Sequence, residues 1–359
     1  MGDVNKKKAL FRHEMRNMIW FLLAGILVTC LLVYILNTLV NEALDYVNPV
    51  NSIDQFKVTF NSLFVDVIPQ IGVAGVFGLT VMTVIQFRDM HSRKSQEYLH
   101  SLPFTKRERF AIKAATGYMV ITVVMIAATA GILFVRGNHI DIIHKSILLS
   151  PYYKVMLGND TLWHVVSIMI VLWLGFMAVY SIMVLAHTFV NKGVLASIIG
   201  FGMTMTPFWF FNVVSIITTE TGKHEVWKDW VNLRGYFGVF IGLSNSRGDQ
   251  MQNFGRVIYY DKFWVLVVIC LVTVVICAAV SLFTVGRKDL ARGGVLVQKR
   301  LARIFLCAGI GLCFGAGIGI FVSLWFWNEV DVLMFAVIGF ISALLIYFLC
   351  EKLFSKVFG

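Results

Sequence analysis

The stretch from residue 86 to residue 118 carries the side chains whose types and spacing best suit binding chemistry. It reads QFRDMHSRKSQEYLHSLPFTKRERFAIKAATGY and lies between two long apolar runs. The spacing predicts an amphipathic helix from about Phe87 to Leu102, with a largely apolar face and a largely polar one. Proline disfavours helical backbone in the residue before it, so Pro103 predicts a turn, and a second helix is expected from Thr105. The segment suits contact with a partner that pushes on it, or it is an ordinary solvated loop with cytoplasmic positive charge.

Motifs for catalysis and for nucleotide or metal binding are missing from the chain. No G-x-x-x-x-G-K-[ST] string occurs, so the chain cannot hold ATP in a P-loop of its own. The histidine pairs His91 with His100 and His139 with His144 lack the cysteine or carboxylate neighbours of a zinc site, and we expect these side chains to be solvated. No catalytic, cofactor-binding or metal-ligating residue is predicted, and the chain is not expected to be an enzyme.

Two groups of residues could lie along a path for a substrate. Asp66 and Gln70 fall near the outer end of a predicted span. The alternative is that Asp66 has no function, because a carboxylate at a helix N-terminus is favourable in any case. Pro207 can kink another span, and the aromatic half that contains Trp209 could line a route for an apolar substrate. Alternatively, these aromatic rings belong to an interfacial belt that faces lipid.

The composition identifies the elements that position these residues as membrane spans. Hydrophobic residues make up 58% of the 359 positions, charged residues make up 14%, and mean hydropathy is +0.78, which excludes a soluble globular domain. Apolar windows of about 20 residues are long enough to cross a bilayer. They predict eight transmembrane helices, at about 18–40, 68–87, 118–135, 163–186, 194–217, 263–285, 304–326 and 332–350. We therefore expect an all-α polytopic membrane protein with a single transmembrane domain over residues 1–359.

Charge gives the expected orientation of these spans. Eight spans place both termini on one side, and 21 of the 31 Lys and Arg residues then fall in the segments on that side. Basic residues near span ends resist translocation, so both termini are predicted to be cytoplasmic. Apart from span ends, no Asp, Glu, Lys, Arg or His falls in a bilayer centre, which disfavours an ion-coupled carrier.

Three further segments carry expectations of their own. Residues 8–17 are predicted to form an interfacial helix that lies flat before the first span. Gly311, Gly315 and Gly319 recur every fourth residue, which favours close helix packing within the chain, with a dimer contact or a mobile seam as alternatives. The long outer loop at 218–262 is expected to hold an interfacial or re-entrant helix, or to pack on neighbouring loops.

The order of these features resembles the permease subunits of ABC-2-type transporters of the ATP-binding-cassette class. The resemblance rests on the interfacial N-terminal helix, the segment between spans 2 and 3, and the string Ser101-Leu102-Pro103-Phe104-Thr105-Lys106-Arg107 that ends it. It covers residues 8–217 well and the remainder loosely, because many members of the family have six spans. It implies that residues 88–102 form a coupling helix, which docks on an ATPase. The coupling residues that it implies are Arg93, Lys94, Gln96, Glu97, Tyr98, Leu99, Leu102 and Pro103.

The resemblance also implies partners and a function. The partners are two copies of a separate ATP-binding subunit, which carries the ATP and magnesium, and a second permease chain, identical or related. The function is export of an amphipathic or hydrophobic compound, such as an antimicrobial peptide, an antibiotic or a lipid, across a bacterial plasma membrane. The alternatives are a non-transporting membrane scaffold or sensor that docks cytoplasmic partners, and, less favoured, a secondary carrier.

Overall fold

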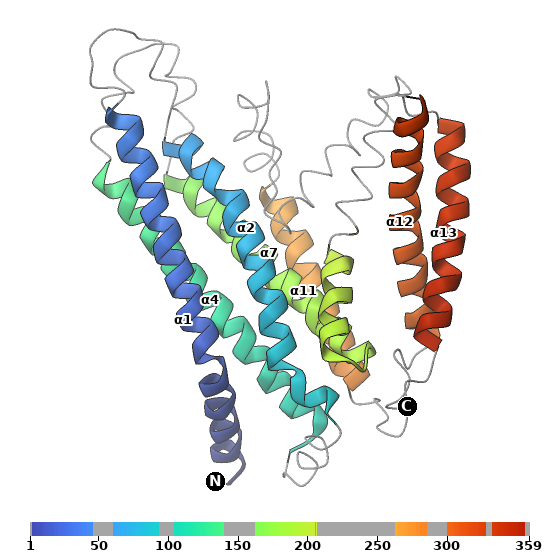
Figure 1. Cartoon of the computed structure of the whole chain (residues 1–359). Helices are drawn as coiled ribbons and strands as arrows, with labels where there is room; N and C mark the ends of the chain where they lie inside the picture. Colours follow the sequence, from blue (N-terminus) through green and yellow to red (C-terminus); the bar gives the residue numbers. More distant parts are fainter. Residues whose placement is uncertain are drawn as a thin grey trace. The chain divides into compact units, whose positions relative to one another are not determined.

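The computed structural model describes residues 2–45, 60–92, 104–139, 162–204, 206, 263–285, 300–327 and 332–355. Every element in these ranges is a helix, which confirms the all-α class (Figure 1). The elements are α1 (Gly2–Asp45), α2 (Phe60–Gln86), the 3-10 helix η2 (Arg88–His91), α4 (Lys106–Asn138), α7 (Leu162–Phe189), α11 (Phe263–Val285), α12 (Arg300–Trp327) and α13 (Val332–Ser355). Another helix, Gly193–Thr204, follows α7 after a tight turn.

Several helices are built to cross a membrane. Five described stretches are long and apolar enough, namely Lys7–Glu42, Lys106–Asn138, Val165–Phe189, Phe263–Val285 and Met334–Lys352. Along α1 the exposed side chains include Trp20, Leu27 and Tyr34, spaced seven residues apart on one face. Such a stripe of large apolar groups suits contact with lipid. The chain is a multi-pass helical membrane protein.

Each of the eight predicted spans falls on a helix, although the predicted fifth span, 194–217, is described only to residue 204 and at residue 206. The helices are longer than the apolar windows that identified them, and α4 begins at Lys106, well before the apolar window at 118–135. A helix can continue beyond an apolar window because its polar turns still satisfy their own backbone hydrogen bonds. For the same reason the basic segment 8–17 is helical as predicted, but it is continuous with the first span in α1.

By its contacts the chain divides into two compact units, and α2, α4, α7 and α11 each contribute to both. In the first unit, α1 packs along α4. A Cβ on Gly25 would lie 2.7 Å from Val124, and one on Gly131 would lie 2.6 Å from Val33, so side chains of each helix fill glycine notches in the other. His139 Nε2 also lies 3.4 Å from Asn37 Oδ1.

Elsewhere in the first unit, an aromatic ring and an indole join α7 to its neighbours. A Cβ on Gly75 of α2 would lie 2.4 Å from the ring of Phe176, so the ring occupies the place of a side chain. Trp173 Nε1 donates to Thr122 Oγ1 of α4 at 3.3 Å, and that hydroxyl donates to the Tyr118 carbonyl in its own helix. These bonds satisfy polar groups that lipid cannot.

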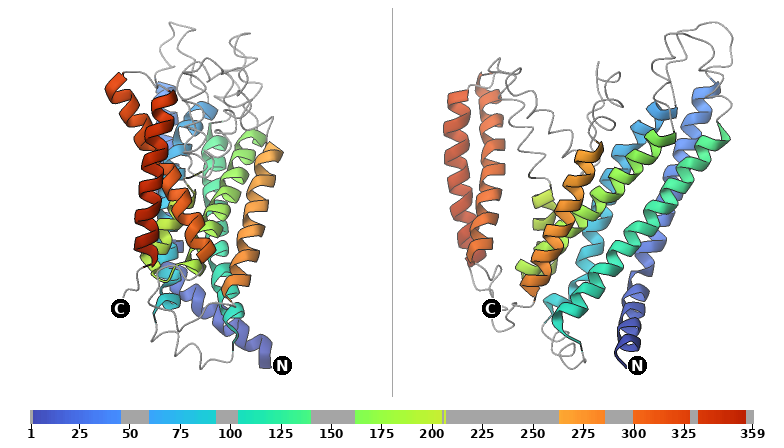
Figure 2. Two further views of the ribbon diagram at one scale, coloured as in Figure 1. Left: turned by 90° about the vertical axis from the view of Figure 1, so that its right-hand side faces the viewer. Right: turned by 180° about the vertical axis from the view of Figure 1, so that it is seen from behind.

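In the second unit, α12 and α13 lie side by side along a glycine stripe (Figure 2). A Cβ on Gly311 would lie 2.7 Å from the Ala343 carbonyl oxygen, and one on Gly315 would lie 2.6 Å from the Ala343 nitrogen. One on Gly319 would lie 2.9 Å from the Phe335 carbonyl oxygen. The stripe therefore brings two backbones together within one chain, as predicted, and we call this contact the glycine seam.

Candidate functional site

The predicted coupling residues lie outside the described residues. Arg93, Lys94, Gln96, Glu97, Tyr98, Leu99, Leu102 and Pro103 all belong to this group, as do Pro207, Trp209 and the outer loop 218–262. Asp66 and Gln70 have described positions in the α2 backbone, but their side chains are not described. The described residues on either side of the predicted coupling segment are the end of α2 with η2, and the start of α4. We call these two ends the frame.

The start of this frame differs from the continuous helix predicted over residues 88–102. Arg88–His91 form a single 3-10 turn, and the backbone at Ser92 is extended, with φ −98° and ψ 120°. The prediction of a continuous α-helix that begins at Arg88 is therefore wrong, because extended backbone at Ser92 interrupts it. Residues 93–103 lie beyond the described part of this connection.

The end of the frame is fixed by a capping box at the start of α4. Thr105 Oγ1 accepts from the Glu108 backbone nitrogen at 3.2 Å, and Glu108 Oε2 accepts from the Thr105 backbone nitrogen at 3.0 Å. The Thr105 hydroxyl also donates to Glu108 Oε2 at 3.1 Å. The reciprocal bonds satisfy amide groups that have no partner within the helix. The predicted helix start after Pro103 is confirmed.

Phe87 anchors the other end. It lies in the turn after α2 and is fully buried. Its ring stacks on the imidazole of His187 with centroids 5.2 Å apart, and lies 5.7 Å from the ring of Phe110 in α4. The end of α2 is thus held by aromatic contacts to α7 and to α4, beyond ordinary area burial.

A chain of polar contacts continues from His187 in both directions. His91 Nε2 lies 2.9 Å from His187 Nδ1, and His187 Nε2 lies 2.9 Å from Ser197 Oγ. Ser197 Oγ in turn lies 3.1 Å from Thr83 Oγ1. We call His91, His187, Ser197 and Thr83 the histidine cluster, which joins η2, α7, the helix Gly193–Thr204 and α2.

Backbone also approaches this cluster closely. A Cβ on Gly193, at the turn after α7, would lie 3.2 Å from His91 Cδ2, so a side chain there would crowd the imidazole. His187, Ser197 and Thr83 are fully buried, whereas His91 is partly exposed. The prediction that His91 is solvated is therefore wrong. Its ring packs against the ring of His187, with centroids 5.1 Å apart, because η2 ends beside α7.

Sequence reasoning did not select His187 as a functional residue. It lies at the end of an apolar run and one position beyond the predicted span at 163–186, where a lone histidine attracts little notice. The available signal was an imidazole followed ten positions later by a serine in the next apolar helix. Its other partner, His91, lies 96 positions away, and Ser197 meets Thr83 across 114 positions, which local patterns do not reveal.

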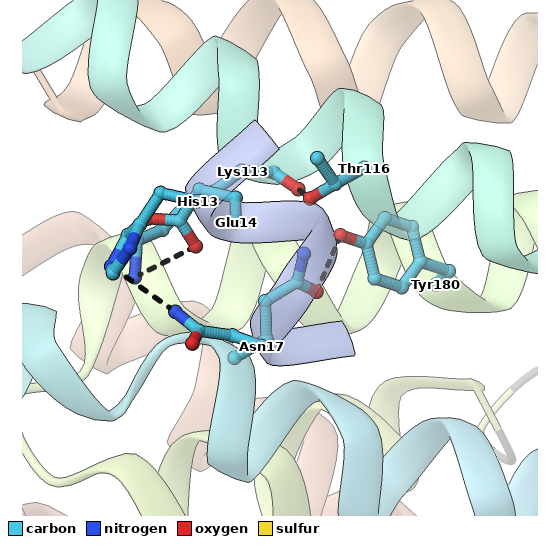
Figure 3. A network of polar contacts seen from close by, with 7 residues as sticks. His13, Glu14, Asn17, Lys113, Thr116 and Tyr180 are labelled. Carbon is cyan, nitrogen blue, oxygen red and sulfur yellow. Dashed lines mark hydrogen bonds and ion pairs between the residues drawn. The ribbon is translucent and has the colours of Figure 1, made fainter. Parts of the chain in front are cut away.

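A buried ion pair joins α1 to α4 in the first unit. Lys113 Nζ lies 3.6 Å from Glu14 Oε2, and both side chains are only 8% exposed (Figure 3). The Glu14 carboxylate, which lies in the segment predicted to lie flat on the membrane, thus faces α4. In the second unit, the Tyr180 hydroxyl donates to Gln86 Oε1 at 2.8 Å, which adds a polar link between α7 and the end of α2.

The described residues hold the two ends of the connection between α2 and α4 in place. No three His, Cys, Asp or Glu side chains among them lie close enough to hold a metal ion. The contacts at Phe87, His91 and Thr105 instead fix the two ends of the connection between α2 and α4. Comparison with known proteins gives no match to a family model, to a curated protein or to a solved structure.

Proposed function

We propose that this chain is the membrane-spanning permease subunit of an ATP-binding-cassette transporter of the ABC-2 type. The observation that carries the proposal is the fixed frame around residues 93–103. The stacked Phe87 and the histidine cluster hold one end, and the Thr105–Glu108 capping box holds the other. When an ATPase pushes on residues 93–103, as the resemblance implies, the displacement would reach α2 through Phe87 and His91, and α4 through Thr105.

Three further observations support the proposal. The protein is helical and multi-pass, and its sequence holds no P-loop, so the energy for transport would come from another subunit. The string Leu102-Pro103-Phe104-Thr105-Lys106 follows the segment in the order found in the resembled family. The spans carry few charged residues, which suits an amphipathic or hydrophobic cargo. The proposed partners are two copies of an ATPase subunit and a second permease chain.

The proposed topology has eight spans with both termini in the cytoplasm, in a bacterial plasma membrane. Single cysteines at Ser95 and Ser244, in a chain freed of its native cysteines, test it with a membrane-impermeant maleimide. Ser244→Cys should react in intact cells, and Ser95→Cys should react only after lysis. Labelling of Ser95→Cys in intact cells would place the segment outside and would contradict the proposal.

The function is tested first by whether a neighbouring gene encodes an ATP-binding protein, and then by copurification of the two proteins and ATPase measurement in nanodiscs. Replacing Glu97 and Tyr98 together by alanine should abolish docking or transport while membrane insertion stays normal. A matched control replaces Glu225 and Trp227, a carboxylate and an aromatic ring on the proposed outer side, and should leave docking intact. Absence of any associated ATPase would refute the transporter and favour a scaffold or sensor.

A further inference from the structure

We propose that the contact between His91 and His187 holds the connection after α2 against the turn after α7, and that it opens when both rings are protonated. We call this contact the latch. The contact joins two residues of this chain and needs no partner protein. Only its consequence, control over how firmly the coupling segment is held, rests on the proposed function.

The order of donors begins at Thr83. Its hydroxyl has one proton and lies 2.9 Å from the Thr80 carbonyl oxygen, a better acceptor than the Met183 sulfur at 3.9 Å. Thr83 therefore donates to Thr80 and accepts from the Ser197 hydroxyl. Since the one Ser197 proton is used there, Ser197 must accept from His187 Nε2. His187 thus carries a proton on Nε2 whenever all these contacts are made.

This order limits the protons that the pair can hold. A neutral His187 has a lone pair on Nδ1 and accepts from His91 Nε2, whether His91 is neutral or cationic. A cationic His187 donates from Nδ1 instead, and His91 must then be neutral to accept. If both rings are cationic, two N–H groups face each other at 2.9 Å. The bond therefore exists when the pair carries no added proton or one, and is lost with two.

The surroundings keep the two rings in this geometry. Phe87 stacks on His187, and the close approach of Gly193 limits how far the His91 ring can retreat while it remains in the cluster. The charged groups of η2, of the start of α4 and of the turn after α7 are Arg88, Asp89, Lys106, Arg107, Glu108, Arg109 and Lys192. The ends of α12 and α13, which pack against the end of α7, add Arg300, Arg303, Glu351 and Lys352. Their sum is positive, so a second proton meets like charge as well as an opposing N–H group. Opening the contact relieves both.

The consequence is a contact that holds near neutral pH and opens in acid. Histidine gains its charge as the pH falls, so exchange is compared at about pH 8 and at about pH 5. Hydrogen–deuterium exchange of the full chain in nanodiscs measures the opening at residues 88–92 and 190–197. After correction for the intrinsic pH dependence of exchange, acid should speed exchange there about tenfold.

Two variants separate a proton limit from ordinary packing. His187→Phe keeps an aromatic ring beside Phe87 but removes both hydrogen bonds, and should exchange fast at every pH. His91→Gln cannot be protonated, and its amide can donate or accept at about the position of Nε2. This variant should stay protected in acid. The matched control, His13→Gln, removes an exposed histidine and should keep the pH response of the native chain.

Each result supports or overturns the latch. A native chain whose exchange does not depend on pH, or a His91→Gln chain that opens in acid as the native chain does, overturns it. Loss of the response in His13→Gln also overturns it. If His187→Phe fails to insert, His91→Gln alone still decides. An acid response without any associated ATPase would keep the latch and refute the proposed function, so the two failures are distinguishable.

Discussion

The glycine seam and the histidine cluster both hold helices together in the second unit, but by opposite means. In the seam, backbone atoms of α12 and α13 approach so closely that one added carbon would meet the Ala343 nitrogen at 2.6 Å. In the cluster, four polar side chains join η2, α7, the helix Gly193–Thr204 and α2 through contacts of hydrogen-bond length. The seam is formed by backbone atoms and small side chains, whereas the cluster contains two histidines whose proposed contact depends on protonation. A rigid contact and an adjustable one thus coexist in the unit.

The largest effect is expected when the seam is broken. Gly315→Val places carbon atoms against the backbone of α13, and should destabilise the protein by about 3 kcal/mol or more because neither backbone can yield cheaply. The measurement is SDS-driven unfolding followed by circular dichroism. Gly309→Val is the matched control in the same helix, since a Cβ there meets nothing within 4 Å. Equal loss in both variants would show that helix propensity, and not the seam, is responsible.

The ion pair between Glu14 and Lys113 sharpens the comparison from the polar side. Glu14→Gln leaves the Lys113 ammonium buried opposite a neutral amide, and should cost about 2 kcal/mol in the same unfolding assay. The exchanged pair, Glu14→Lys with Lys113→Glu, should recover part of this loss because opposite charges again face each other. If the exchanged pair is no better than Glu14→Gln, the contact acts through packing alone.

A smaller effect is expected inside the histidine cluster. Ser197→Ala removes the hydroxyl between His187 and Thr83, and should cost about 1 kcal/mol because a buried N–H group loses its acceptor. Thr204→Val is the control in the same helix, since that hydroxyl donates to the Gly200 carbonyl in its own helix. The control should change the free energy of unfolding by less than about 0.5 kcal/mol. A reversed order would remove the cluster as a stabilising contact.

The smallest effect is expected at the capping box. Thr105→Ala removes the side-chain acceptor of the Glu108 amide, and should cost about 0.5 to 1 kcal/mol of stability. Thr105→Ser keeps the hydroxyl and should behave as the native chain. In the proposed transporter, Thr105→Ala should also lower ATPase stimulation, because one end of the frame is loosened. Identical ATPase activity in the two variants would separate the cap from coupling.

Local patterns predicted the helices and some of their ends. The apolar windows found every described span, and Pro103 predicted the start of α4 after the turn. The glycine spacing predicted the seam, because small residues four positions apart share one face wherever they pack. These features depend on neighbours along the chain.

The candidate site was harder to predict because its contacts join distant positions. His91 meets His187 across 96 residues, and Thr83 meets Ser197 across 114. The extended backbone at Ser92 also interrupts a segment whose apolar spacing is helical, so periodicity gave the wrong start for that helix. The predicted coupling residues from Arg93 to Pro103 lie outside the described part of the chain and stay predictions.

The length of α1 gives its packing on α4 a further consequence. At about 1.5 Å per residue its 44 residues extend roughly 66 Å, about twice the hydrocarbon thickness of a bilayer. Contacts at Glu14, Gly25, Val33 and Asn37 each meet α4 about 100 positions later, so the two helices run parallel in one register. Contacts at four points along their length resist sliding of one helix along the other, so the two helices move as one rigid body. A displacement imposed at Lys113 should therefore reach Asn37 undiminished, and any bending must occur in helices that lack such a partner.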